Sequence, residues 1–154
     1  MIYLGIDPGK SGAVAVYDSR ANTLEVLKCP ETETGMADLI HNHTHKAANV
    51  ECYIEKVHGG VFGGAKGQKA GSVSMFNFGR NFGGWLGILA AFQIRTHTVP
   101  PKKWQGKMGD LPKDKDKRKN EIHQRMEREF PSVRIYKYAA DAVAILAVHV
   151  DIKI

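Results

Sequence analysis

The opening stretch, MIYLGIDPGKSGAVAVYD, constrains the fold more than any other part of the chain. Two runs rich in apolar and β-branched residues, 1–7 and 12–18, flank the turn residues Pro8 and Gly9. Such runs on either side of a short glycine-containing turn are typical of a β-hairpin. The chain therefore begins with two antiparallel strands, and Asp7 stands where the first of them ends.

The turn also contains Gly9, Lys10 and Ser11, which match the end of a nucleotide-binding phosphate loop. That loop needs four residues between its first glycine and its Gly-Lys-Ser, and a helix directly after it. Here only three residues separate Gly5 from Gly9, and a strand follows. A phosphate loop is excluded, and Asp7 is either an ordinary turn residue or a functional acid.

The remainder alternates between strand-like and helix-like segments. Further strands are predicted at 23–27, 50–55, 94–99 and 133–136. Helices are predicted at 35–46, at 73–91 and at 139–150, with a short helix that starts at Pro100 and a separate helix that ends at about Phe130. Three hairpin-like strands followed by strands alternating with helices predict an α/β domain with a mixed sheet. The 154 residues suit a single domain, 1–154.

Composition narrows the setting. Lys and Arg number 22 against 16 acids, a formal charge of +6, which favours a polyanionic partner. The two cysteines have no metal-site spacing, which fits a reducing compartment. No apolar run is long enough to span a membrane, and the chain enters its first strand without a basic leader. We therefore expect a cytoplasmic protein without a membrane segment.

Three acids stand at the ends of predicted elements: Asp7, Glu55 and Asp141. Functional side chains gather at such positions in open α/β sheets, although an acid in the first turn of a helix is also favoured by the helix dipole alone. Carboxylates brought together repel one another, and a divalent cation with oxygen ligands relieves the repulsion. Two such ions are the usual means of cleaving phosphodiesters.

Five blocks make the chain resemble the RuvC-type Holliday junction resolvases, especially their compact phage and poxvirus branch. The blocks are GIDPGKSGAVAV, YIEKVHG, SMFNFGRNFGGWLGILAA, VPPKKWQ and AADAVAILAVH, in the family's order and at its spacing. They cover nearly the whole chain. The resemblance implies an RNase H-like fold, Mg²⁺-dependent cleavage of four-way DNA junctions (with Mn²⁺ as a substitute), a homodimer and, for a phage protein, the host cytoplasm.

The resemblance also assigns roles. Asp7, Glu55 and Asp141 match the first, second and last acids of the family's site, so we expect them to be both metal ligands and catalytic residues. One lysine is expected to stabilise the phosphate during cleavage, and the candidates are Lys103 and Lys117.

The chain departs from the family at one position of this site. RuvC-type enzymes usually carry a further acid or histidine a few residues before the last aspartate. Here Tyr138 stands three residues before Asp141 and Lys137 four before. Neither is a good Mg²⁺ ligand. Either another residue or water completes the shell, or the chain cleaves poorly.

Candidate DNA contacts come from a glycine-rich loop, 58–72, and from two lysine-rich runs. The loop's six glycines allow close backbone approach, and Phe62 is a candidate wedge between base steps, unless it folds back onto the core. The lysine runs contact phosphates or, alternatively, form a solvated surface. The candidate residues are Phe62, Lys66, Lys69, Arg80, Lys102, Lys103, Lys107, Lys117 and Arg118.

The helix 73–91 carries glycines at 79, 83 and 87, which form one stripe by their four-residue spacing. Each glycine inside a helix is unfavourable by about 1 kcal/mol relative to alanine, so a stripe of three suggests close packing of another backbone. The partner is either the chain's own sheet or the twin helix of a dimer. Family resemblance favours the dimer, with Gly79, Phe82, Gly83 and Gly87 at the interface.

Three other functions share parts of this pattern. The actin, Hsp70 and sugar-kinase superfamily opens with a similar hairpin but needs two such lobes, and 154 residues supply one. An RNase H or YqgF-like nuclease would have the same fold and an RNA-containing substrate. A junction-binding protein with a degenerate site would explain the missing fourth ligand.

Overall fold

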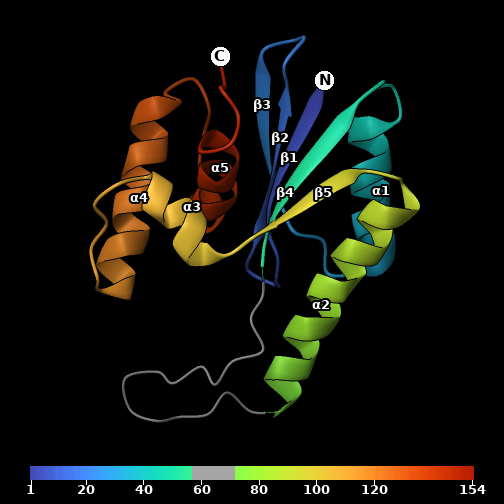
Figure 1. The fold of residues 1–154 in the computed structure, drawn as a ribbon, viewed down its shortest axis with the longest axis horizontal. Helices are drawn as coiled ribbons and strands as arrows, with labels where there is room; N and C mark the ends of the chain where they lie inside the picture. Colours follow the sequence, from blue (N-terminus) through green and yellow to red (C-terminus); the bar gives the residue numbers. More distant parts are fainter. Residues whose placement is uncertain (57–71) are drawn as a thin grey trace.

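The computed structural model describes residues 1–56 and 72–154. Their strands form one sheet in the order β3-β2-β1-β4-β5 (Figure 1). β1 pairs antiparallel with β2, and β2 with β3, whereas β4 is parallel to both β1 and β5. This is the predicted mixed sheet. The strands are β1 Ile2–Asp7, β2 Ala13–Asp18, β3 Thr23–Lys28, β4 Val50–Glu55 and β5 Arg95–Val99.

Helices cover both faces of the sheet (Figure 1). They are α1 Glu33–Thr44, α2 Ser72–Ala91, α3 Pro101–Lys107, α4 Lys115–Glu129, the 3-10 helix η1 Lys137–Ala139, and α5 Ala140–Ala147. α1 and α2 pack with one apolar cluster of the sheet, and α3, α4 and α5 with the other. No helix in the described ranges is both long and apolar enough to cross a membrane.

Residue alternation along β1 decides what faces each layer. Ile2, Leu4 and Ile6 are buried in the cluster shared with α1 and α2. Since strand side chains alternate between faces, Gly5 and Asp7 point to the other side, where α5 lies. The sheet thus presents an acid to the helix layer that carries Asp141.

α5 lies against β1 at a glycine. A Cβ atom at Gly5 would collide with the carbonyl oxygen of Ala142 and would come within 2.8 Å of Leu146 Cβ. α5 is also rich in small residues, and Ala140, Ala142 and Ala144 are buried. Small side chains on both elements allow the helix to approach the strand closely, which brings its first turn to the end of β1.

The hairpin turn also depends on glycine. Gly9 has φ of +127°, a conformation that L side chains rarely adopt. The Gly12 amide donates to the Gly9 carbonyl at 3.0 Å, and a Cβ at Gly12 would collide with the Asp7 carbonyl. These two glycines close the turn tightly beside Asp7.

Two predicted elements differ clearly from the structure. The prediction of a strand at 133–136 is wrong, because those residues form no strand. Ile135 is buried, and its carbonyl lies 2.8 Å from His123 Nε2 on α4, so this segment pairs with a helix and not with the sheet. The last helix, predicted at 139–150, ends at Ala147, and the following amides turn back onto its last carbonyls.

Gly5→Ala should destabilise the chain by about 1–3 kcal/mol, the usual effect of overpacking a close contact. Gly106→Ala is the matched control, since nothing lies within 4 Å of a Cβ at that helical position. It should raise stability by about 0.4–1 kcal/mol through the unfolded state. Urea unfolding of both variants measures the difference, and an unchanged Gly5→Ala would mean that α5 does not depend on this contact.

Candidate active site

Asp7 and Glu55 end two neighbouring parallel strands. Ile6 of β1 pairs with Ile54 of β4, so Asp7 and Glu55 follow at the next step of both strands. Ile54 is buried with α1 and α2, which turns Glu55 to the α5 side by alternation. Strand register alone thus brings two carboxylates to one edge of one face.

Asp141 completes the group from the opposite layer. It lies in the first turn of α5, the helix that packs closely on Gly5 of β1. Asp7, Glu55 and Asp141 line one cavity of about 440 Å³, which the hairpin turn, Gln105 and the start of α4 also border. Acids that lie far apart in the sequence therefore share one site.

Their proximity changes their acidity. Burial, followed by repulsion from Asp141 and Glu55, raises the pKa of Asp7 from its ordinary 3.8 to about 8. Burial also raises the pKa of Glu55 and of Asp141. Without a cation the three carboxylates resist full ionisation, so added positive charge would stabilise the site.

Two cations of α4 supply part of this positive charge. Lys119 Nζ lies 3.8 Å from Asp141 Oδ2, and both Lys119 and Arg118 lower the pKa of Asp141 against the effect of burial. Lys115, Arg118, Lys119 and Ile122 all line the cavity. Their spacing of three, four and seven residues places them on one helix face.

Trp104 of α3 holds Glu55. Its ring is fully buried, and Nε1 donates a 2.7 Å hydrogen bond to Glu55 Oε2. This bond lowers the pKa of Glu55, opposing the effect of burial, and restricts the carboxylate to one orientation. Trp104 is thus a positioning residue for the site.

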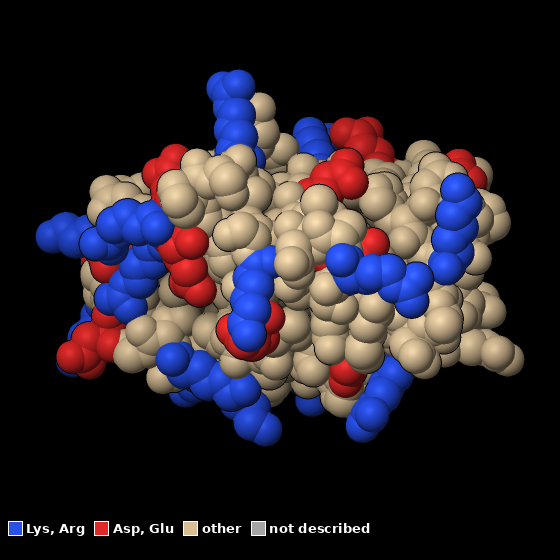
Figure 2. Space-filling model, turned by 90° about the horizontal axis from the view of Figure 1, so that it is seen from above, with Lys and Arg blue, Asp and Glu red and all other residues tan. Residues whose placement is uncertain are grey.

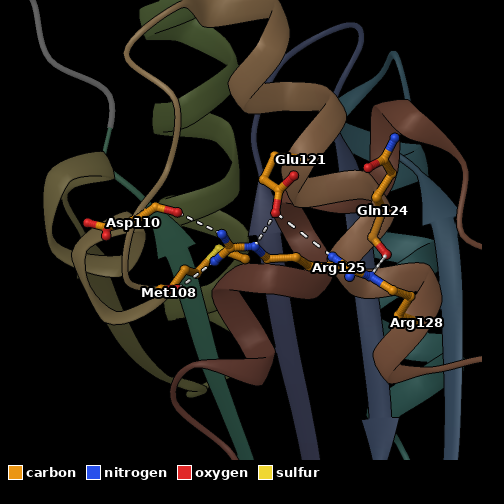
Figure 3. A network of polar contacts seen from close by, with 6 residues as sticks. All are labelled: Met108, Asp110, Glu121, Gln124, Arg125 and Arg128. Carbon is orange, nitrogen blue, oxygen red and sulfur yellow. Dashed lines mark hydrogen bonds and ion pairs between the residues drawn. The ribbon is translucent and has the colours of Figure 1, made fainter.

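An arginine network fastens α4 to the loop that precedes it (Figure 3). Arg125 donates to Glu121 Oε1 at 2.7 Å, to the Met108 carbonyl at 2.7 Å and to the Asp110 carbonyl at 2.6 Å. Arg128 adds a 3.8 Å ion pair to Glu121. The network joins α4 to the end of α3 and so holds the cationic face of α4 relative to the α3 residue Trp104.

The donor set fits a hard divalent cation. All three acids supply oxygen, the ligand type that Mg²⁺ and Mn²⁺ take, and a cation would relieve the repulsion that raises the pKa of Asp7. Within the described ranges, no three His, Cys, Asp or Glu side chains are grouped tightly enough to form a ready metal shell. The carboxylates therefore line the cavity without being drawn together.

Other predicted residues lie elsewhere. Lys103 and Lys117 do not line the cavity, and neither does Tyr138, which stacks on Tyr136. Lys102 and Lys103 are exposed, and Lys107 Nζ lies 3.4 Å from the Val148 carbonyl. The candidates Phe62, Lys66 and Lys69 fall outside the described residues.

Arg80 is held in an ion pair with Glu33, 2.7 Å between Nη2 and Oε1. Both residues border a second cavity of about 700 Å³ between α1 and α2, which shares Gly9, Lys10 and Phe78 with the carboxylate cavity. The predicted DNA contact at Arg80 is therefore partly neutralised within the chain.

Sequence reasoning missed Lys119 and Trp104. Ile122 and Met126 are the buried positions of α4, and the helical period projects them back onto Arg118 and Lys119, not onto Lys117. That projection could have identified the inward-facing cations. Trp104 could have been singled out as the one large apolar residue within a lysine-rich run.

Basic residues are not gathered at the far end of the molecule. Figure 2 looks at the end opposite the start of α2, where Lys and Arg are interspersed with Asp and Glu. At the cavity, Lys10, Lys115, Arg118 and Lys119 likewise lie beside three acids. Cations and acids are thus mixed both at this end of the molecule and at the cavity.

The comparisons with known proteins agree on the fold. The structure of Thermus thermophilus RuvC in complex with a Holliday junction substrate matches with a TM-score of 0.64 and 15% identity, over 97% of this chain and 92% of that one. This is an RNase H-like fold similar to that of RuvC. A second T. thermophilus RuvC structure matches with a TM-score of 0.59 and 16% identity, over 97% and 93% of the two chains. No protein-family model and no curated protein sequence matches the chain.

The raised pKa of Asp7 predicts that the metal-free protein loses stability as pH rises. The unfolded chain releases the Asp7 proton near pH 3.8, whereas the folded chain holds it up to about pH 8, so folding is progressively disfavoured across that window. At about 1.4 kcal/mol per pKa unit, the loss reaches at most about 6 kcal/mol. Asp7→Asn should therefore be the more stable protein at pH 8 in EDTA.

Thermal unfolding in EDTA at pH 5 and pH 8 measures this. Asp18→Asn is the control, because Asp18 ends the adjacent strand but is only half-buried, and backbone hydrogen bonds from Arg20 and Ala21 lower its pKa. It should gain nothing at pH 8. Destabilisation by Asp7→Asn at pH 8 would show instead that the ionised Asp7 makes favourable contacts.

Proposed function

We propose that this protein is a metal-dependent endonuclease that cleaves branched DNA, including four-way junctions. The observation that carries the proposal is the cavity at which Asp7, Glu55 and Asp141 meet beside the cationic face of α4. The RuvC structure of similar fold was solved with a Holliday junction substrate. A site of half-buried acids bordered by lysine and arginine suits a phosphodiester bound through a cation.

Asp7, Glu55 and Asp141 would hold Mg²⁺, or Mn²⁺ in its place. Two such ions supply an activated water and neutralise the charge that develops on the phosphate. Within the chain, Trp104 orients Glu55. The raised pKa of Asp7 means that metal binding would release a proton.

Lys119 is our candidate for the phosphate lysine. It pairs with Asp141 at 3.8 Å and remains 46% exposed, so its ammonium can reach both the acid and a bound phosphate. Lys117 lies on the same helix but does not line the cavity. The exposed lysines 102, 103 and 107 would contact more distant phosphates and make binding salt-dependent.

We also propose a two-fold dimer through α2. Nothing in the described part of the chain lies within 4 Å of a Cβ at Gly79, Gly83 or Gly87, so the stripe does not pack on its own sheet. Phe82, by contrast, packs against the chain's own core. A symmetric pair of sites suits a junction with two strands to cut.

Cleavage of a labelled synthetic four-way junction with Mg²⁺ tests the function. Asp7→Asn should reduce cleavage at least about 100-fold while junction binding persists, because the change removes a metal ligand and no phosphate contact. Lys119→Ala should lower cleavage by about 100- to 1,000-fold, in the range found when one charge-stabilising donor is removed. Lys117→Ala is the matched control and should cleave nearly as well as wild type.

Three results would redirect the proposal. Preference for an RNA–DNA hybrid over the junction would indicate an RNase H or YqgF-like nuclease. Tight junction binding without cleavage in either Mg²⁺ or Mn²⁺ would indicate a binding protein with a degenerate site. Wild-type cleavage by Asp7→Asn would remove Asp7 from the metal site.

Solution mass tests the dimer. The wild type should sediment at twice the 17.0 kDa chain mass at micromolar concentration. Gly83→Leu should shift the equilibrium to monomer with an unchanged circular dichroism spectrum, since a Cβ at this position meets nothing within the described chain. A wild-type monomer would refute the dimer, and a dimeric Gly83→Leu would move the interface away from the stripe.

A further inference from the structure

Two exposed tyrosines form a stacked pair directly before Asp141. The rings of Tyr136 and Tyr138 lie 5.5 Å apart at an interplanar angle of 11°, and their residues are 43% and 38% exposed. The Arg134 guanidinium carbon lies 5.0 Å from the centre of the Tyr136 ring. Three planar groups thus assemble on the surface of one short segment.

The segment is anchored although its tyrosines are exposed. η1 contacts β2, β3, α4 and α5, while Ile135, Ala139 and Ala140 are buried. A backbone held at both ends by buried residues keeps the intervening rings at one place on the surface. The pair is therefore a preformed feature and not the tip of a free loop.

The pair lies about one helical turn before an acid of the carboxylate cavity. Tyr138 precedes Asp141 by three residues, and helical turns run continuously from Lys137 to Ala147. Residues three apart in such a stretch have Cβ atoms about 5–6 Å apart. Asp141 lines the cavity and Tyr138 does not, so Tyr138 neighbours a residue of the cavity without being part of its wall.

The segment that carries the pair is itself positively charged. Residues 131–140 contain Arg134 and Lys137 and no acid, and both cations are exposed. Aromatic rings beside cations, next to a phosphate site, match the chemistry by which proteins hold single-stranded nucleic acid: the rings stack on bases and the cations face the backbone.

We propose that Tyr138, supported by Tyr136, is a stacking platform for an unpaired nucleobase adjacent to the phosphate bound at the carboxylate cavity. The platform rests on the proposed function, since it places a base of the same DNA strand. It also gives a role to the position at which the RuvC-type family usually carries a metal ligand: the tyrosine contacts the substrate instead. A base pair at a branch point lacks continuous stacking on one side, so its bases are unpaired more easily than those of an uninterrupted duplex.

The test uses DNA carrying 2-aminopurine, whose fluorescence falls on stacking. Two probes are needed: a four-way junction with the label in the base pair next to the crossover, and a short single strand. In EDTA, wild type should quench both probes. Tyr138→Ala should lose the quenching and bind the junction about 5- to 150-fold more weakly, which corresponds to the effect of one stacked base.

Matched variants separate stacking from folding. Tyr138→Phe keeps the ring and should retain quenching and affinity, whereas Tyr138→Leu keeps bulk without a π face and should behave like Tyr138→Ala. Phe92→Ala is the surface control, since Phe92 is also 38% exposed but lies beyond the far end of α2. It should leave binding unchanged.

The outcomes distinguish the platform from the function. If wild type cleaves junctions and Tyr138→Ala quenches and binds as well as wild type, the platform is wrong and the nuclease stands. If wild type neither binds nor cleaves junctions but quenches the single strand in a Tyr138-dependent way, the nuclease is wrong and the platform stands. Equal losses in Tyr138→Phe and Tyr138→Ala would assign the contact to the hydroxyl and overturn stacking.

Discussion

The close approach of α5 to β1 at Gly5 is the contact on which the rest of the site depends. Any side chain at this position would collide with the Ala142 carbonyl, so helix and strand approach to a distance that only glycine permits. This approach carries Asp141 to the ends of β1 and β4. The buried alanines of α5 serve the same purpose, because small side chains let the helix lie flat on the sheet. An acidic cluster is thus a consequence of backbone packing.

Such packing is electrostatically unfavourable in the chain alone. Burial and mutual repulsion raise the pKa of Asp7 to about 8, and the pKa values of Glu55 and Asp141 rise as well. The surrounding structure offsets this only in part, through Lys119 beside Asp141 and Trp104 on Glu55. A site held in this state binds a cation more favourably than separated acids would, since the cation removes the repulsion that folding created. The three acids thus lower the folding stability of the metal-free chain, and the same repulsion favours binding of the cation that the proposed reaction needs.

The two helix layers carry different kinds of residues. α1 and α2 form an apolar layer with the sheet on the side away from the acids, and α2 leaves its glycine face open. α3, α4 and α5 carry the groups that reach the cavity, and the Arg125 network couples α3 to α4. The anchored Arg134, Tyr136 and Tyr138 segment leads directly into α5 of the same layer. Phosphate and base contacts would then share this layer, and the partner contact would lie on α2.

The sequence by itself determined the antiparallel hairpin, the mixed sheet and the three acids at element ends, because strand alternation and turn glycines are local properties. It did not determine which cations face the acids. The apolar residues Ile122 and Met126 mark the face of α4 on which Lys119 lies, but only the packing of α4 places that face beside the acids. Nor did it reveal that Trp104 binds Glu55, or that 133–136 pairs with α4 and not with the sheet. These contacts join residues distant in the chain, so the packing of helices on the sheet decided them.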